Sequence, residues 1–313
     1  MSLFDAFRER RPFPGQDPWV VPHDGSLLLV QSAGGNRRIV VKRFRDLQHM
    51  DRNVETVVWA PRGEDRRRQL WAPELHEIDG HWYLYFAAAE GLGGHRMYVL
   101  EADDPLGPYR DLGKVGDAAH DCWAIDMTVF TSAGRLYAVW SGWDGPDDGF
   151  PQNLYIAPMS NPWTISGERR CLSRPELDWE MSVAPVNEGP TVFSHAGSGR
   201  LFVSYAADAS WTTAYKTGLL ECVGGDVTDP AGWRKSPEPW VADGGHGCVV
   251  DTDGGAQFVY HRKLTSEPGW GDREIVSAPL LWDATGYPVA LSARSSVPVE
   301  AAGGFSEPLG RVA

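Results

Sequence analysis

Four acidic residues and one histidine recur at similar spacing along the chain. Asp17, Glu74, Asp126, Glu188 and His246 are separated by 57, 52, 62 and 58 residues. If such carboxyl groups converge, each negative charge opposes the ionisation of its neighbours and perturbs their pKa values. Hydrolysis of a glycosidic bond needs one carboxylic acid to protonate the leaving oxygen and a second carboxylate to assist attack from the opposite face. The spacing therefore predicts a site for general acid–base hydrolysis.

The segments that follow these residues share one design. Each has an apolar run, a turn with glycine and a strand rich in aromatic and branched side chains, as half-buried strands should be. Three of the turns read Asp24-Gly25, Asp79-Gly80 and Asp253-Gly254, and these residues supply the positive φ angles of tight hairpins. A repeat of roughly 57 residues accommodates a four-stranded sheet, and five such sheets arranged radially form a five-bladed β-propeller.

The fold prediction is therefore an all-β protein in which residues 1–313 form a single-domain propeller after a short lead-in over 1–14. Helical turns are expected only at Phe4–Arg10 and Leu47–Val57. A β-sandwich would show shorter and more even strand spacing. The signature of the common protein-interaction propeller does not recur with the repeat, which disfavours a scaffold of that type.

Composition limits the partners and the compartment. The 313 residues include 29 Lys and Arg against 42 Asp and Glu, and the net charge of −13 disfavours nucleic acid and anionic membranes as partners. No apolar run approaches the roughly 18 residues of a membrane span, and the N-terminal segment lacks the apolar core of a signal peptide. The chain as written is expected in the cytoplasm, or outside the cell if a leader was removed. The four cysteines form no CxxC pair and are expected to be small buried thiols.

Five motifs, in order and at the spacing of the repeat, resemble glycoside hydrolase family 43. They are Asp17-Pro18-Trp19-Val20, Leu70–Leu75 with Ile78–Tyr85, Trp123–Phe130, Val186–Pro190, and Gly269–Glu274 with Gly286-Tyr287-Pro288. The resemblance covers nearly the whole chain. It implies a five-bladed propeller that cleaves arabinofuranosides or xylosides with inversion. Further segments are similar to the α-L-arabinofuranosidase branches, namely Gln152–Ala157, Met159–Trp163 and Ser210-Trp211 with Gly218–Leu220.

The resemblance assigns a role to each of three carboxylates. Asp17 is implied to be the general base, Asp126 the modulator that raises the pKa of the acid, and Glu188 the general acid. Taken singly, each residue also has a structural explanation: Asp17 caps a turn before a proline, Asp126 links strands by a hydrogen bond, and Glu188 lies in a surface loop. Glu74 is explained equally well as a structural partner of backbone amides and as a substrate contact.

Other residues are candidates for binding. The resemblance implies that His246 lies near a water-coordinated cation, often calcium, although a hydrogen bond in the pocket explains it equally well. Arg273 is implied to reach sugar hydroxyls. Trp71, Trp143 and Trp211 are candidate stacking platforms for sugar rings. Several of the 14 tryptophans must instead pack between blades, and this is the competing explanation for each of the three. No cofactor is expected to be required, and a structural calcium ion on the propeller axis is implied.

Two positions depart from the family pattern. Met127 directly follows Asp126 where the family usually has glycine. Gly247-Cys248 follows His246 where asparagine and serine or threonine are usual. Both departures are expected close to the pocket.

The leading hypothesis is an inverting, exo-acting α-L-arabinofuranosidase that releases arabinose from arabino-oligosaccharides or side chains. A β-xylosidase or galactofuranosidase would use the same carboxylates. A carbohydrate-binding propeller without turnover, or a protein-interaction propeller, would not need three acids at matched positions. The mechanism predicts that the three carboxylates converge, with Asp17 and Glu188 about 6.5–9.5 Å apart to leave room for a water molecule.

Overall fold

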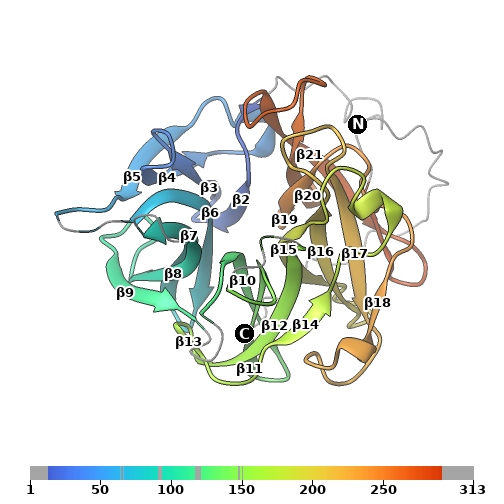
Figure 1. The fold of residues 1–313 in the computed structure, drawn as a ribbon. Helices are drawn as coiled ribbons and strands as arrows, with labels where there is room; N and C mark the ends of the chain where they lie inside the picture. Colours follow the sequence, from blue (N-terminus) through green and yellow to red (C-terminus); the bar gives the residue numbers. More distant parts are fainter. Residues whose placement is uncertain are drawn as a thin grey trace.

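Five twisted sheets surround a central axis, as the view along that axis shows (Figure 1). The structure is a computed structural model that describes residues 13–63, 65, 67–90, 94–116, 121–146, 149 and 151–290. The predicted all-β, five-bladed propeller is confirmed. Each blade runs outward from the axis by short antiparallel hairpins, so that its first strand is the innermost one.

The blades follow one another in chain order. Blade 1 contains β2 (Trp19–His23), β3 (Ser26–Ala33), β4 (Arg38–Phe44) and β5 (Val54–Trp59). Blade 2 contains β6 (Arg67–Ile78), β7 (His81–Glu90), β8 (His95–Ala102) and β9 (Arg110–Val115). Blade 3 contains β10 (Ala124–Ser132), β11 (Arg135–Gly142), β12 (Asn153–Asn161), β13 (Thr164–Ile165) and β14 (Arg170–Ser173). Blade 4 contains β15 (Asn187–Ser194), β16 (Leu201–Ala207), β17 (Lys216–Cys222) and β18 (Trp233–Lys235). Blade 5 contains β19 (Gly245–Thr252), β20 (Gly255–Lys263), β21 (Arg273–Trp282), β22 (Pro288–Ala290) and β1 (Phe13–Pro14).

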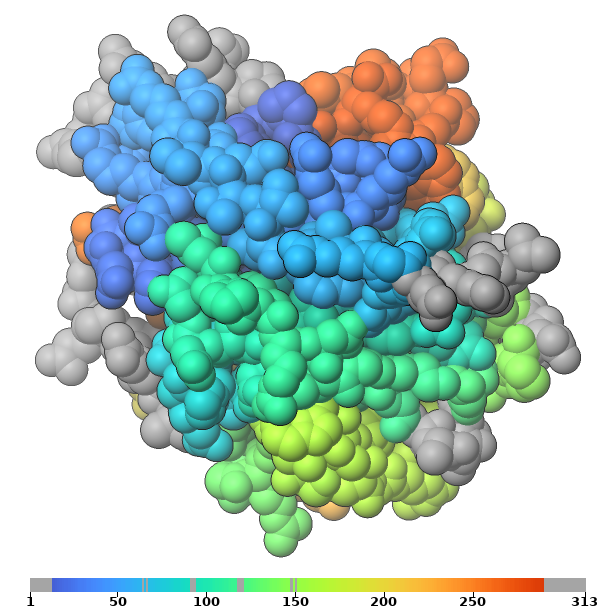
Figure 2. All heavy atoms as spheres, turned by 90° about the vertical axis from the view of Figure 1, so that its left-hand side faces the viewer, coloured from blue at the N-terminus to red at the C-terminus, as the bar shows by residue number. Residues whose placement is uncertain are grey.

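The innermost strands form a closed ring. Strand β2 contacts β6, and contacts continue through β10, β15 and β19 back to β2. The N-terminal end of the chain also closes the ring, because β1 pairs with β21 of blade 5 and places Phe13 opposite Ile275. Residues 13 and 14, assigned to the lead-in from the sequence, therefore complete the last blade. Figure 2 shows the outer edges of blades 1 and 2 lying side by side, with part of blade 3 beneath them.

Helical structure is confined to short 3-10 turns in the described part of the chain, at Leu47–His49, Asp178–Glu180 and Pro230–Gly232. The predicted helical turns at Leu47–Val57 are correct only at their start. Residues from Val54 onward form β5 instead, since this valine- and threonine-rich segment pairs with β4. The predicted turn at Phe4–Arg10 lies outside the described residues. Among the described residues, no helix is long and apolar enough to cross a membrane.

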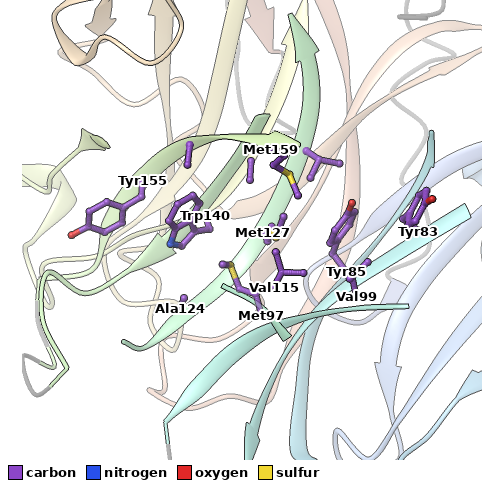
Figure 3. Close-up of a cluster of buried hydrophobic side chains, with 13 residues drawn as sticks. Tyr83, Tyr85, Met97, Val99, Val115, Ala124, Met127, Trp140, Tyr155 and Met159 are labelled. Atoms are coloured by element: carbon purple, nitrogen blue, oxygen red, sulfur yellow. The ribbon is translucent and has the colours of Figure 1, made fainter. Parts of the chain in front are cut away.

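The hydrophobic core lies between adjacent blades. Figure 3 shows one such layer, in which side chains of blade 2 such as Met97 and Val115 meet Met127 and Met159 of blade 3. Met127 is thus buried between blades. Cys248 is likewise buried, in the layer between blades 5 and 1, where its sulfur accepts a hydrogen bond from the Val20 amide. Both departures directly follow a candidate site residue in the chain, while the Met127 and Cys248 side chains point into these inter-blade layers.

The four cysteines differ in burial. Cys122 and Cys248 are buried, whereas Cys171 and Cys222 are only partly buried. The expectation of small buried thiols is therefore correct for two of the four.

Candidate active site

A kink at one end of each innermost strand builds the site. Asp17, Ala72, Asp126, Gly189 and His246 have positive φ angles of 48°, 42°, 56°, 53° and 50°. In blades 2 to 5 the strand register shifts at the same place. Such a bulge re-aims the local side chain, and positive φ in a residue other than glycine costs on the order of 1–3 kcal/mol. The same kink in all five blades, strained in the four where the residue is not glycine, therefore places one position of each blade at the end of the axis.

The kinks also show that Glu74 and Glu188 do not occupy the same position in their blades as Asp17, Asp126 and His246 do. Glu74 comes two residues after the kinked Ala72, and Glu188 comes one residue before the kinked Gly189. Glu74 is buried, and its carboxyl is hydrogen-bonded to Thr128 and lies 2.9 Å from the His76 imidazole. Of the two explanations for this residue, the contacts support the structural one.

The other predicted carboxylates come together around His246. The Nδ1 atom of His246 lies 3.4 Å from Asp17 Oδ1 and 3.8 Å from Asp126 Oδ2. Asp126 Oδ2 also accepts a hydrogen bond of 3.0 Å from the amide of Gly189, the residue that follows Glu188. The two aspartates therefore lie beside the backbone that carries Glu188.

Only a glycine fits at position 189. Besides the positive φ, a Cβ atom there would lie 2.5 Å from the His246 ring. The close approach of β15 to β19, which brings Glu188 next to His246, depends on this missing side chain.

Electrostatics divides the carboxylates into two kinds. Burial raises the pKa of Asp126 to about 8, with a further contribution from the charge of Asp17. Burial and the charge of Asp126 raise the pKa of Glu188 to about 7, although His246 opposes this shift. Asp126 and Glu188 titrate as a pair, because ionisation of one raises the pKa of the other. At neutral pH the pair therefore holds a proton that it can donate.

Asp17 behaves in the opposite way. Burial alone would raise its pKa, but the neighbouring His246, His261 and Arg273 more than offset this and lower the pKa below its ordinary value of 3.8. The carboxylate of Asp17 is therefore ionised at neutral pH. An ionised carboxylate and a protonated one in the same site are the two groups that general acid–base catalysis requires.

Two residues that sequence reasoning missed hold these groups in place. The Tyr215 hydroxyl donates a hydrogen bond of 2.8 Å to Glu188 Oε1. Its ring stacks on His261, at a centroid distance of 5.4 Å and an interplanar angle of 22°. The Nδ1 atom of His261 accepts a hydrogen bond of 3.1 Å from the amide of Asp17. Burial lowers the pKa of His261 to about 3, so that its imidazole is neutral.

The sequence did contain a signal for both residues. His261 lies near the end of β20 opposite the start of β19, and Tyr215 directly precedes β17. These positions are at the same end of the blades as the kinks. Polar residues at the matching ends of the second and third strands could therefore have been added to the candidates.

Arg273 is a neighbour of both Asp17 and His261. It is buried, its Nε donates a hydrogen bond of 3.1 Å to the Trp270 carbonyl, and one terminal nitrogen lies 3.4 Å from His261 Nε2. Arg273 is therefore not a solvent-exposed arginine. Whether it also reaches sugar hydroxyls stays a prediction.

The predicted tryptophans fall into two groups on the same face. Trp71 stacks on His95 at 3.6 Å, and Trp143 stacks on Trp123 at 4.9 Å, within one cluster of blades 2 and 3. Trp211 lies 5.2 Å from Trp270, in the loops of blades 4 and 5. Trp71, Trp143 and Trp211 are only partly buried, so that each retains a surface a sugar could contact.

The side chains do not form a direct calcium site. Within the described residues, no group of three His, Cys, Asp or Glu side chains could hold a metal ion. The Nδ1 atom of His246 faces two carboxylates instead. Because Ca²⁺ prefers six to eight oxygen ligands, a cation here would have to be held largely through water.

An acid and a base carboxyl group brought together at one end of the propeller axis are the two groups that hydrolysis of a glycosidic bond needs, so the site is that of a glycosidase class. The particular family is given by comparison with known proteins. The chain belongs to the glycosyl hydrolases family 43, whose sequence profile matches residues 12–288.

Relatives and solved structures agree with this family. The chain is 35% identical, over 285 residues, to a protein of Streptomyces chartreusis named extracellular exo-α-(1→5)-L-arabinofuranosidase, and the match covers 82% of this chain and 85% of that protein. It is 36% identical to α-L-arabinofuranosidase 43 of Humicola insolens, with 84% of this chain but only 56% of the relative covered. The crystal structure of an α-L-arabinofuranosidase from Lactobacillus brevis superposes with a TM-score of 0.79 at 30% identity, and covers 88% of this chain and 93% of the other.

Proposed function

We propose that this glycosidase is an exo-acting α-L-arabinofuranosidase that releases arabinose from arabino-oligosaccharides or side chains with inversion of configuration. The choice of sugar is supported by the names of the relatives in Streptomyces chartreusis and Humicola insolens. The reaction type is supported by the convergence of Asp17, Asp126 and the Glu188 backbone around His246, which is the observation that carries the proposal. The opposite pKa shifts of Asp17 and Glu188 agree with it.

The proposed reaction is a single displacement. Asp17 accepts a proton from a water molecule while the water oxygen bonds to the anomeric carbon. The bond from that carbon to the glycosidic oxygen breaks on the opposite face, and Glu188 gives its proton to the departing oxygen. Asp17 is then protonated and Glu188 ionised, so that exchange with solvent restores both groups.

The supporting residues act on these two groups. Asp126 raises the pKa of Glu188 and, through the Gly189 amide, fixes the backbone beside it. Tyr215 orients the acid, and the neutral His261 orients the backbone of Asp17. Arg273 is proposed to contact the sugar hydroxyls, and Trp71, Trp143 and Trp211 to stack against sugar rings.

Proton NMR of the first product tests the mechanism. An α-(1→5)-linked arabinobiose should give arabinose that appears first as the β-anomer, before mutarotation. An initial α-anomer would refute inversion and the role of Asp17 as a base. A panel of nitrophenyl α-L-arabinofuranoside, β-D-xyloside and β-D-galactofuranoside tests the sugar, and preferred cleavage of either of the last two would refute the arabinose assignment.

Two further proposals concern the surroundings of the enzyme. A structural calcium ion is proposed near His246, held through water, and no catalytic step depends on it. Chelation should therefore lower the melting temperature without abolishing turnover at 25 °C. The compartment is proposed to be the cytoplasm, or the outside of the cell if a leader was removed, and the Streptomyces chartreusis relative is named extracellular. Activity found in the culture medium of the native organism would contradict a cytoplasmic enzyme.

A further inference from the structure

Glu180 is a fully buried carboxyl group that the proposed reaction does not use. It ends the 3-10 turn Asp178–Glu180, in the connection that leads from β14 of blade 3 to β15 of blade 4. A buried carboxylate is costly unless hydrogen bonds and an opposite charge compensate it. The partners of Glu180 therefore show what this buried group holds in place.

Five donors surround the Glu180 carboxyl group, at distances of 2.8–3.1 Å. They are the backbone amides of Glu176 and Leu177, the Tyr205 hydroxyl, the Asn187 side chain and the Lys235 ammonium group. Burial alone would raise the pKa of Glu180, but the two backbone amides and the charge of Lys235 more than offset this and lower the pKa below its ordinary value of 4.5. Glu180 is therefore ionised at neutral pH.

Asn187 connects Glu180 to the general acid, because it directly precedes Glu188 in β15. Its side-chain nitrogen donates to Glu180 Oε1, and its Oδ1 atom accepts a hydrogen bond of 2.8 Å from the Ser173 hydroxyl in β14. Successive side chains of a strand point to opposite faces, so that Asn187 points between the blades while Glu188 points to the site. A fixed Asn187 side chain therefore fixes the rotation of the strand about its own axis.

The backbone of Asn187 is held by blade 3 as well. Its amide donates a hydrogen bond of 3.0 Å to the Gln152 carbonyl, and its carbonyl accepts one of 2.9 Å from the Ser141 hydroxyl. Pairing with β16 is in register at Asn187 and Glu188, and the register shifts before Thr191. Glu188 is therefore the last residue in register before the kink, and the bonds at Asn187 anchor its backbone to blade 3.

We propose that Glu180 and Asn187 are positioning residues for the general acid. The buried carboxylate fixes Asn187, and Asn187 holds β15 so that the Glu188 carboxyl group meets the leaving oxygen. This inference rests on the proposed function. Proton transfer needs the acid within hydrogen-bond reach of the leaving oxygen, and a displacement of about 1 Å can lower the rate on the order of 10²-fold. A loosened Asn187 should therefore weaken proton transfer to that oxygen.

The test compares two substrates that share the cleaved sugar and differ in their need for an acid. An α-(1→5)-linked arabinobiose has a poor leaving group, whereas dinitrophenyl α-L-arabinofuranoside needs little protonation. Asn187→Ala should lower kcat/KM for arabinobiose by about tenfold or more, and for the dinitrophenyl substrate by no more than about threefold. Glu180→Gln should show the same selectivity. If Glu180→Gln does not fold, Asn187→Ala decides, because it keeps the ion pair of Glu180 with Lys235.

A double-mutant cycle shows whether Asn187 acts through the acid. In a Glu188→Gln enzyme, Asn187→Ala should cause little further loss on arabinobiose, because the proton that it helps to deliver is already absent. Glu221→Gln is the matched control. Glu221 is a buried carboxylate of the same blade, ion-paired with Arg200 and Arg234 at the end of β17 that lies away from the site. It should leave the ratio of the two substrates unchanged.

Equal losses on both substrates for the Asn187 and Glu180 variants would assign these residues a structural role and overturn the proposal. An unchanged arabinobiose rate, additive losses in the Glu188→Gln enzyme, or the same selectivity in Glu221→Gln would overturn it as well. A Glu188→Gln enzyme that loses both substrates equally would instead refute Glu188 as the acid. A wild-type enzyme that cleaves neither arabinofuranoside would refute the proposed function.

Discussion

Removal of the Tyr215 hydroxyl should move the alkaline limb of the pH profile upward. Tyr215 donates a hydrogen bond of 2.8 Å to Glu188 Oε1, and this bond lowers the pKa of Glu188 because it favours the ionised carboxylate. Glu188 must be protonated to act as the acid. In Tyr215→Phe its pKa should rise from about 7, so that the acid keeps its proton to higher pH.

The size of the shift follows from the strength of the lost bond. A hydrogen bond to a charged group contributes roughly 1.5–3 kcal/mol, and one pKa unit corresponds to about 1.36 kcal/mol. Full loss of the bond would therefore raise the pKa by about one to two units. A water molecule that replaces part of the interaction reduces this, and a shift of about one unit is expected.

The measurement is kcat/KM against pH, since this ratio reports the acid and base of the free enzyme. Tyr83→Phe is the control, because its hydroxyl donates a similar bond of 2.9 Å to Glu101 in β8, away from the kinked strand ends. The control should leave both limbs unchanged. An alkaline limb that stays in place or moves down in Tyr215→Phe would refute Glu188 as the group that sets it.

Three other substitutions test the remaining parts of the site. Glu188→Gln should reduce hydrolysis of arabino-oligosaccharides by about 10²–10⁴-fold and of dinitrophenyl arabinofuranoside far less, since a good leaving group needs little protonation; equal losses would show that Glu188 is not the acid. Asp126→Asn removes a negative charge that raises the pKa of Glu188, so that the alkaline limb should move to lower pH, and an upward shift would contradict the modulating role. Gly189→Ala should lower the melting temperature clearly more than Gly199→Ala. Both glycines have positive φ, but only at position 189 would a Cβ meet the His246 ring, and equal effects would show that the close approach of β15 to β19 is not needed.

The sequence alone determined the architecture and the principal acids. Turn residues such as Asp24-Gly25 and the aromatic strands after them are local signals, since a hairpin forms between neighbours in the chain. Their recurrence predicted the propeller, which the five sheets confirm. Asp17, Asp126 and Glu188 stood out because their spacing repeats with the blades, and the structure brings all three to one end of the axis.

The tertiary structure decided which side chains reach that end. Side chains alternate along a strand, and a bulge that adds one residue reverses the faces of all that follow. The kink at Asp126 sends Met127 into the inter-blade core, and Glu74, two residues after the kink at Ala72, is buried against His76 and Thr128. A period-two pattern in the sequence does not locate these kinks.

The partners of the acids were also set only by folding. His261 meets the Asp17 amide across 244 residues of chain, through the closure of blade 5 against blade 1. Tyr215 meets Glu188 from the segment that leads into β17 of blade 4. The sequence signals only that each residue lies at the matching end of its blade. Its pKa effect and its hydrogen bond exist only when distant segments share a low-dielectric pocket, and that proximity is a property of the closed ring of blades.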